Sequence, residues 1–335
     1  MKTIREMGVT RMRYVREILR ALLKKDLDIW EIASFSAVPM RELTKTLKIL
    51  RKNGYVDENN YRFSLTKEGE NFAEELGVKE VGDKVCPECD GRGIAIDDDF
   101  LKEFEEISRN RPYNVPEYDQ SFITTDSTIA RVLFMLNYGD IDGKNIIVLG
   151  DDDLVSIAIA MTGLAKKVTA IDIDERILEF INDQELGIKT IRFDLRDPIP
   201  RDLRDKFDCF TTDPPDTAIA LTLFVCRGLE CLKEEGSGYF SMTFTDAPLS
   251  RWYFVEKSLM DMGFVVTDIR RNFSTYELYP EIAKLYRGEG VSEEVPEPTK
   301  RWYKSNLFRI ELIKDKNIIY EERVDGDLYD YMEGP

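Results

Sequence analysis

Strand-like and helix-like patterns alternate along the chain from Asn145 onward, and this alternation limits the possible fold more than any other feature. Short runs rich in apolar and β-branched residues predict strands at 145–149, 167–172, 189–194, 207–213, 238–244, 264–268 and 307–312. Amphipathic segments predict helices at 154–164, 175–183 and 218–232. Repeated β-α-β units build a parallel sheet with helices on both faces. We therefore predict an α/β protein with a Rossmann-like, doubly wound sheet.

A smaller helical unit precedes this sheet. Apolar residues recur at helical spacing over 12–22 and 41–52, and Asn53-Gly54 ends the second of these helices. Two short alternating runs and a helix capped by Thr66 follow. This order is typical of a winged helix-turn-helix domain. The basic residues on or near its recognition helix would be Arg41, Lys45, Lys48, Arg51 and Lys52.

DNA binding is one interpretation of that unit, and dimerisation or substrate docking is the other. Residues 1–80 hold 16 basic and 13 acidic side chains, a small excess for a DNA-binding domain. The remaining residues carry a net charge of −20, which repels phosphate backbones and attracts polycations. Nucleic acid is therefore disfavoured as a partner, and a homo-oligomer is expected because small helical domains often pair with their own copy.

Four regions follow from these patterns. They are a winged-helix-like domain at 1–79, a linker at 80–118, a Rossmann-like domain at 119–315 and an acidic tail at 316–335. The linker contains Cys86 and Cys89 in a CxxC pair, which is half of a zinc-ribbon pattern, whereas a structural zinc needs four ligands. These two cysteines are therefore weak metal candidates, and we expect no metal requirement.

The chain contains no histidine. A general base that works near neutral pH must therefore be a carboxylate or a perturbed Lys, Cys or Tyr. Ser-His and Cys-His nucleophile pairs are excluded. No apolar run reaches the ~18 residues that a membrane span requires, and the N-terminus lacks a signal-peptide core, so a cytoplasmic protein is expected. The charged, Gln-poor composition favours a thermophilic source.

An aspartate follows each of the first four predicted strands. These residues are Asp151 to Asp153, Asp172, Asp194 and Asp213. Ligands of doubly wound sheets bind at the carboxyl ends of the strands. Asp172 lies 22 residues after Gly150 and is placed to accept hydrogen bonds from ribose hydroxyls. Asp194, by analogous position, would face an adenine amino group.

The first of these loops contains one glycine, Gly150, followed by Asp151, Asp152 and Asp153. Three carboxylates would repel a pyrophosphate, and also the carboxylate of S-adenosylmethionine. They would attract decarboxylated S-adenosylmethionine, which bears a sulfonium and a free ammonium. One charge pair at about 4 Å is worth ~4 kcal/mol before desolvation, enough to discriminate. A Mg²⁺ site is the alternative interpretation.

The motif at 212–217 looks like the Asp-Pro-Pro-aromatic motif of amino-group methyltransferases, which makes the predicted fold class I methyltransferase-like. In that motif the acid holds the attacking amine and the aromatic ring stacks on a base. Here Asp213-Pro214-Pro215 is followed by Asp216 and Thr217. Losing the ring and adding a charge favours an aliphatic polyamine over a nucleobase.

Taken together, the Gly-Asp-Asp-Asp and Asp-Pro-Pro-Asp motifs behind a winged-helix-like domain resemble the branched-chain polyamine synthases of thermophiles. The resemblance covers nearly the whole chain. It implies transfer of aminopropyl groups from decarboxylated S-adenosylmethionine to the internal N4 nitrogen of spermidine. The implied products are N4-aminopropylspermidine, N4-bis(aminopropyl)spermidine and methylthioadenosine. Linear aminopropyltransferases place an acid at the position of Asp153 but in a Gly-rich loop, so the linear reaction is disfavoured.

These interpretations assign roles to ten residues. The predicted catalytic residues are Asp153 and Asp213, and either could accept the proton of the attacking amine. The predicted polyamine ligands are Asp151, Asp152, Asp216 and Thr217. The predicted co-substrate ligands are Gly150, Asp172, Asp194 and Gln120. An S-adenosylmethionine-dependent methyltransferase and a polyamine-sensing DNA-binding regulator stay open as alternatives.

Overall fold

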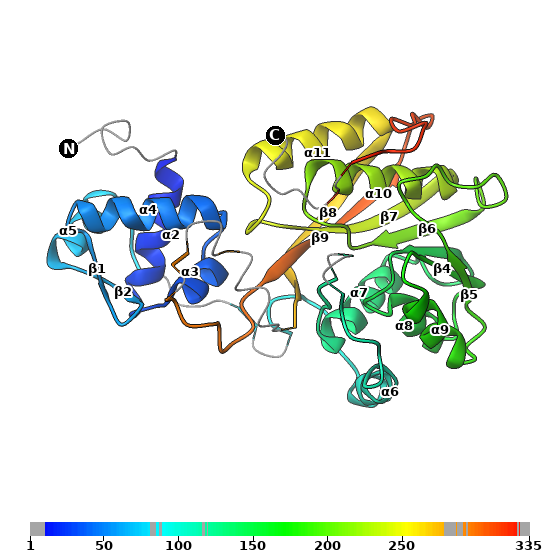
Figure 1. The fold of residues 1–335 in the computed structure, drawn as a ribbon, viewed down its shortest axis with the longest axis horizontal. Helices are drawn as coiled ribbons and strands as arrows, with labels where there is room; N and C mark the ends of the chain where they lie inside the picture. Colours follow the sequence, from blue (N-terminus) through cyan, green and yellow to red (C-terminus); the bar gives the residue numbers. More distant parts are fainter. Residues whose placement is uncertain are drawn as a thin grey trace. The chain divides into compact units, whose positions relative to one another are not determined.

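The computed structural model describes residues 11–80, 85–86, 89–115, 118, 120–277, 286, 291–292, 294–326 and 328, and it divides the chain into two compact units (Figure 1). One unit comprises Met1–Val85, Phe244–Pro248 and Tyr276–Lys304. The other comprises Cys86–Thr243, Leu249–Thr275 and Ser305–Pro335. We call them unit 1 and unit 2 and describe each by itself.

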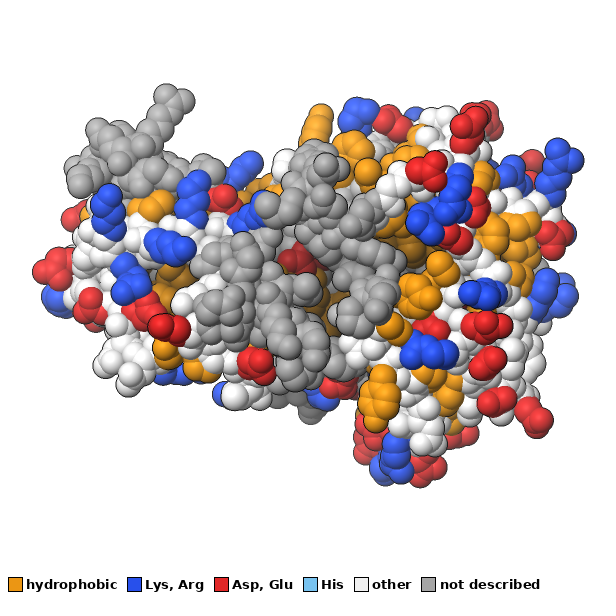
Figure 2. All heavy atoms as spheres, in the orientation of Figure 1, with side chains coloured by type: hydrophobic (Ala, Val, Ile, Leu, Met, Phe, Trp, Pro, Cys, Tyr) orange, Lys and Arg blue, Asp and Glu red, His pale blue; other side chains and the backbone are white. Residues whose placement is uncertain are grey.

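Unit 1 contains the predicted order of helices and hairpin. Its elements are α2 (Met12–Leu22), α3 (Ile29–Phe35), α4 (Met40–Lys52), β1 (Val56–Asn59), β2 (Arg62–Leu65) and α5 (Lys67–Glu75). A capping box between Asp28 and Glu31 starts α3, and Thr66 caps α5 as predicted. The Lys and Arg side chains of α4 lie exposed, and basic side chains are seen over α4 in Figure 2.

The core of unit 1 includes residues from far along the chain. Trp302 packs against Trp30, and the indole N–H of Trp30 donates to the Pro296 carbonyl at 2.9 Å. Residues 276–304 are predicted to lie within the Rossmann-like domain, whereas their described part belongs to unit 1. The apolar residues in this Glu- and Pro-rich segment explain the difference, because they bury aromatic surface in the helical core.

Unit 2 is built on a seven-stranded sheet in the order β5-β4-β3-β6-β7-β9-β8. The strands are β3 (Asn145–Leu149), β4 (Lys167–Asp172), β5 (Lys189–Arg192), β6 (Phe207–Thr212), β7 (Leu232–Thr243), β8 (Phe264–Thr275) and β9 (Lys304–Leu312). The first five strands in this order pair in parallel, and β9 pairs antiparallel with β7. The predicted α/β class with a mostly parallel sheet is therefore confirmed.

Helices cover both faces of this sheet. The helices α7 (Thr125–Asn137), α8 (Val155–Met161) and α9 (Glu175–Asp183) lie on one face, whereas α10 (Ala218–Cys231) and α11 (Leu249–Met262) lie on the other (Figure 1). No helix in the described ranges is long and apolar enough to cross a membrane.

The region from 80 to 118 is more than a linker. It contains α6 (Asp98–Ser108), which begins at an Asp97 cap and buries Phe104 in the core of unit 2. The acidic tail is also ordered over its described part, because Leu328 is buried against Ala220 and Leu223 of α10. Both segments pack through apolar side chains against partners that are distant in sequence.

Candidate active site

A cavity of about 420 Å³ opens at the carboxyl ends of β3, β4 and β6. Six of the predicted site residues line it, namely Gln120, Gly150, Asp152, Asp172, Asp194 and Asp213. The other four, Asp151, Asp153, Asp216 and Thr217, are buried and do not line the cavity. The acids at the strand ends therefore converge as predicted. Some of them line the cavity, and the others are buried and do not line it.

The loop after β3 is held by its own backbone and by Asp172. Gly150 has φ +72°, a left-handed conformation that favours glycine, and its N–H donates to the Ile171 carbonyl at 2.8 Å. The Asp172 carboxylate accepts from the backbone N–H groups of Asp151 and Asp174, both at 2.8 Å. Asp172 thus shapes the loop as well as lining the cavity, and Asp174 caps α9.

Asp151 points away from the cavity. Its carboxylate is fully buried and accepts from the backbone N–H of Ser156, at 3.2 Å and 3.3 Å, in the first turn of α8. A carboxylate near the N-terminal turn of a helix is favoured by the helix dipole. Asp151 therefore supports the loop, and its side chain does not line the cavity.

A buried arginine joins the two predicted catalytic acids. Arg131 of α7 is 1% exposed, and its Nη2 lies 2.9 Å from Oδ2 of Asp213. Its Nη1 lies 3.8 Å from Oδ2 of Asp153. The other oxygen of Asp153 accepts from the backbone N–H of Ile123 at 2.8 Å. The guanidinium therefore fixes the spacing of the two carboxylates.

Sequence reasoning missed Arg131. One signal was present, because the residue is a lone cation in the middle of an otherwise apolar helical stretch. A cation that folding buries must find a carboxylate partner. The sequence did not indicate which acids it would meet, since Asp213 lies 82 positions away.

The three acids of the loop after β3 resist ionisation. Burial raises the pKa of Asp153 to about 7, and the charge of Asp213 adds to this rise while Arg131 opposes it. Burial likewise raises the pKa of Asp151 to about 7. The pKa of Asp152 is raised well above its ordinary value by burial and by Asp153, Asp172 and Asp213. This excess of carboxylates over nearby cations favours a positively charged ligand.

These shifts predict that stability falls as pH rises. A folded pKa near 7, against an ordinary value of 3.8, means that the folded chain retains protons which the unfolded chain releases. The resulting contribution is complete at acidic pH and is lost as pH rises through about 7. We expect the guanidinium chloride concentration at the unfolding midpoint to fall as pH rises from about 5 to about 7 and to level off above that. A double Asp151→Asn, Asp153→Asn variant should flatten the profile, and an unchanged slope would contradict the assignment.

The cavity is also lined by apolar side chains and by an acid that is held in its ionised form. Ile173, Phe193, Leu195 and Phe224 line it, a composition suited to a flat ring. Partial burial tends to raise the pKa of Asp194, but hydrogen bonds from Arg196 and Arg323 outweigh this effect and hold the pKa at about 2.

Gln120 is held beside this cavity by two hydrogen bonds. Its carbonyl oxygen accepts from the backbone N–H of Val115 at 2.8 Å, and its amide donates to Asp174 at 3.1 Å. It lines the cavity, and its role as a co-substrate ligand stays a prediction.

The loop after β6 is stabilised by the two residues that follow its prolines. The Asp216 carboxylate accepts from the backbone N–H of Thr243, at 3.1 Å and 3.2 Å. The Thr217 hydroxyl accepts from the N–H of Ala220 and donates to the Leu328 carbonyl. Both side chains lie behind the cavity wall, whereas Asp213 and Pro215 line the wall itself.

The CxxC pair lies outside this cavity. Cys86 is exposed, and the backbone N–H of Gly93 donates to the sulfur of Cys89 at 3.3 Å, which lowers the pKa of that thiol. Over the described ranges, no three His, Cys, Asp or Glu side chains are grouped as metal ligands would be. A metal role for the pair stays a prediction.

Comparison with known proteins places the chain in a family. The family model described as Branched-chain polyamine synthase A C-terminal domain matches residues 99–334. The chain belongs to the branched-chain polyamine synthase family. The N(4)-bis(aminopropyl)spermidine synthase of Methanocaldococcus jannaschii is 38% identical over 325 residues, which cover 93% of this chain and 91% of that protein. The synthase of the same name from Thermococcus kodakarensis is 37% identical over 330 residues, covering 95% and 93%.

A solved structure from this family is also similar. It is the branched-chain polyamine synthase of Thermus thermophilus in complex with N4-aminopropylspermidine and 5'-methylthioadenosine. The TM-score is 0.87 at 32% sequence identity, and the match covers 98% of this chain and 95% of that one. The fold of this chain is therefore that of the branched-chain polyamine synthases.

Proposed function

We propose that this protein transfers aminopropyl groups from decarboxylated S-adenosylmethionine to the N4 nitrogen of spermidine. The products are N4-aminopropylspermidine, then N4-bis(aminopropyl)spermidine, with methylthioadenosine released at each step. The observation that carries this proposal is the cavity wall, where Asp152, Asp172 and Asp213 lie with the buried acid Asp153 close behind. The names of the relatives support the same reaction.

The donor would bind along the wall formed by β3, β4 and β5. Asp172 accepts the ribose hydroxyls, and Gln120 closes beside the nucleoside. The apolar residues after β4 and β5 hold the adenine, with Asp194 beside its amino group. The acids nearest Gly150 attract the sulfonium and the ammonium, and they would repel the carboxylate of intact S-adenosylmethionine. This preference argues against the methyltransferase alternative.

The transfer itself is a single displacement. The neutral N4 nitrogen attacks the propyl carbon next to the sulfonium, the new C–N bond forms, and the C–S bond breaks to release methylthioadenosine. The sulfonium charge already activates the leaving group, so the step needs no metal. Free spermidine is protonated, so before the attack N4 must pass its proton to a carboxylate, and we assign this role to Asp153 because its pKa of about 7 suits a base at neutral pH. The first displacement makes N4 a tertiary amine, and the second makes it a quaternary ammonium.

The remaining acids hold the acceptor in place. Asp213, fixed by Arg131, lies at the wall beside the attacking nitrogen, and Asp152 binds a terminal ammonium of spermidine. Asp216 and Thr217 maintain the loop that carries Asp213, and Asp151 maintains the loop that carries Asp153. Positioning of this kind contributes much of the rate in a displacement between two bound substrates.

Unit 1 has the element order of a winged-helix domain, and we propose that it is winged-helix-like. We propose no DNA-binding function for it. The basic side chains of α4 favour an anionic partner, but unit 1 also contains Glu42, Glu58 and other acids close in sequence to that helix.

A mass-spectrometric assay tests the proposed reaction. The protein is incubated with spermidine and either decarboxylated or intact S-adenosylmethionine. We expect methylthioadenosine and mass gains of one and two aminopropyl units with the decarboxylated donor alone, and fragmentation should place both groups on N4. Absence of product with that donor, or methyl transfer from the intact donor, would refute the proposal.

A further inference from the structure

The CxxC pair, Cys86 and Cys89, takes no part in the proposed reaction and differs from the other cysteines in exposure. The chain has five cysteines. Cys209, Cys226 and Cys231 are buried, whereas Cys86 is exposed and Cys89 is half-buried. Reagents that modify thiols reach exposed sulfur atoms far more readily than buried ones. Of the five cysteines, the CxxC pair is therefore the one open to modification in the folded chain.

The short loop after Cys89 folds around the sulfur of that residue. The backbone N–H of Gly93 donates to this sulfur at 3.3 Å, and the N–H of Gly91 and the thiol of Cys86 also donate to it. Gly91 and Gly93 have left-handed φ angles of 78° and 73°, which allow successive N–H groups to point into one concavity. Such hydrogen bonds favour a thiolate, which is the nucleophile in disulfide exchange.

We propose that Cys86 and Cys89 form a reversible dithiol–disulfide site that reacts with small disulfides, and that its redox state affects the acids Asp153 and Asp213. The thiolate of Cys89 attacks one sulfur of the external disulfide, whose S–S bond breaks to release one small thiolate. Cys86 then loses its proton to solvent and attacks the sulfur of Cys89, which expels the second small thiolate. The protein loses two electrons and two protons, and the small disulfide is reduced to two thiols.

Arg92 lies in the same loop and connects it to the start of α7. Its side chain is 6% exposed, and it donates to the Asp126 carboxylate at 2.6 Å and to the Ser127 hydroxyl at 3.1 Å. Its Nε donates to the Phe273 carbonyl of β8 at 2.8 Å. The backbone N–H of Arg92 also donates to the carbonyl of Cys89 at 2.9 Å. A change of backbone conformation at Cys89 therefore displaces a buried cation that α7 and β8 both bind.

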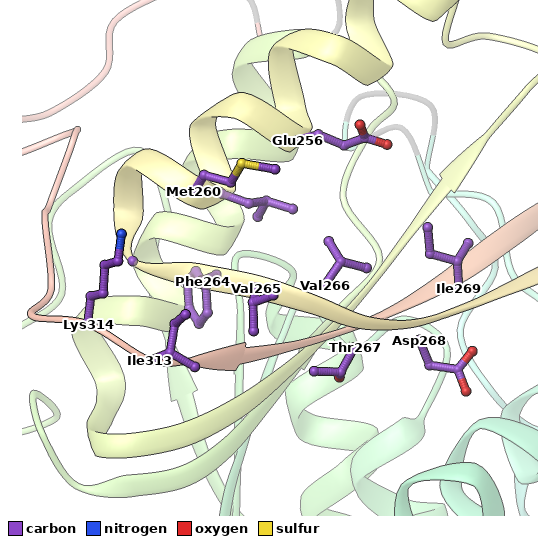
Figure 3. Close-up of a pocket in the computed structure, with 12 residues that line it drawn as sticks. Glu256, Met260, Phe264, Val265, Val266, Thr267, Asp268, Ile269, Ile313 and Lys314 are labelled. Carbon is purple, nitrogen blue, oxygen red and sulfur yellow. The ribbon is translucent and has the colours of Figure 1, made fainter.

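The strand β8 and helix α7 lie together behind this loop. A side-chain carbon added at Gly93 would lie 3.6 Å from Nη1 of Arg270. Arg270 pairs with Asp268 at 3.0 Å, and its guanidinium carbon lies 5.2 Å from the centre of the Phe134 ring in α7. Asp268 extends from one side of β8 and Ile269 from the other (Figure 3). The loop therefore has packed neighbours on its inner side, and a change in its backbone is coupled to α7.

Helix α7 connects this loop to the catalytic acids. Its Thr128 hydroxyl donates to the backbone carbonyl of Asp153 at 3.2 Å, and its Arg131 contacts both Asp153 and Asp213. Every residue along this route belongs to unit 2. The disulfide removes the thiolate that accepts the loop N–H groups, so Arg92 is held less firmly and the acids are placed less accurately.

A redox titration followed by mass spectrometry tests the dithiol without any use of catalytic activity. The folded protein is equilibrated with mixtures of reduced and oxidised glutathione, quenched in acid, unfolded and alkylated. We expect alkylation of all five thiols under reducing conditions, and of the three buried ones alone under oxidising conditions, with no glutathione retained. Five free thiols at every ratio, or glutathione retained on the wild type, would overturn the proposal.

Two variants identify the attacking sulfur. Cys86→Ser removes the thiol that completes the exchange, so Cys89 should retain one glutathione. Cys226→Ser is the control in the buried core, and it should still lose two thiols as the wild type does. A Cys86→Ser protein that retains no glutathione would show that Cys89 does not attack the external disulfide. The wild-type titration does not depend on the folding of either variant.

The link to catalysis rests on the proposed function and is tested by turnover at each glutathione ratio. Oxidation should lower the wild-type kcat by roughly two- to thirtyfold, the usual range of coupling through packed side chains, with the midpoint of the thiol titration. A Cys86→Ser, Cys89→Ser variant should show no such dependence. Arg92→Met should lower kcat in the reduced protein and remove most of the further loss on oxidation.

Two outcomes separate this inference from the proposed function. A wild-type kcat that stays constant while the thiols titrate, or that falls equally in the Cys86→Ser, Cys89→Ser variant, would overturn the link to catalysis. A reduced protein that titrates as expected but transfers no aminopropyl group would instead refute the proposed function.

Discussion

Asp153→Asn is expected to lower kcat by roughly 10²- to 10⁴-fold, the range over which a positioned general base contributes to catalysis. The amide keeps the size of the side chain, and its oxygen can still accept from the Ile123 N–H, so the loop should retain its shape. The amide cannot take a proton from the attacking amine. Turnover of spermidine with the decarboxylated donor, measured under saturating conditions, checks this loss.

Two control variants test whether the effect of Asp153→Asn depends on where this carboxylate lies in the fold. Asp151 has the same raised pKa as Asp153 but faces Ser156, so Asp151→Asn should lower kcat far less. Asp208 lies at the beginning of β6 and accepts from Asn145 and Lys233, and Asp208→Asn should leave kcat near its wild-type value. Wild-type activity should rise with pH through about 7, and Asp153→Asn should lose this dependence. Near wild-type turnover in Asp153→Asn would remove the residue from the mechanism.

Arg131→Met is expected to destabilise the protein by about 3–5 kcal/mol, the usual cost of removing one partner of a buried ion pair. The guanidinium is 1% exposed and reaches Asp153, Asp213 and the hydroxyls of Ser241 and Ser274. Without it the acids lose their nearest cation, and the pKa of Asp153 rises further. Unfolding by guanidinium chloride, followed by circular dichroism at constant pH, measures the change in the free energy of unfolding.

A rescue variant shows whether the stability lost in Arg131→Met has an electrostatic origin. Adding Asp213→Asn to Arg131→Met removes the carboxylate that is left without its partner, so part of the lost stability should return. Arg192→Met is the control on an exposed pair, because Arg192 and Glu175 are both 62% exposed and such pairs contribute at most about 1 kcal/mol. If Arg131→Met and Arg192→Met had the same unfolding midpoint, this would contradict the role of Arg131 as the link between Asp153 and Asp213.

The sequence by itself determined the sheet and the convergence of its strand-end acids. The limits of β3, β4 and α9 match their predicted ranges, because apolar periodicity is a local signal. Asp172 and Asp213 reach one cavity because strands in a parallel sheet end at a common edge. This rule needs only the chain order of strands and loops.

Only the tertiary structure decided which acids face the cavity and what holds them. Asp216 turns to the backbone of Thr243, and Arg131 crosses from α7 to Asp213, through contacts between residues 27 and 82 positions apart. The described tail likewise contributes Leu328 to the cavity wall from more than a hundred positions beyond Thr217. Local periodicity holds no information about such contacts, because they arise from the burial of polar groups that must find partners once the helices have packed.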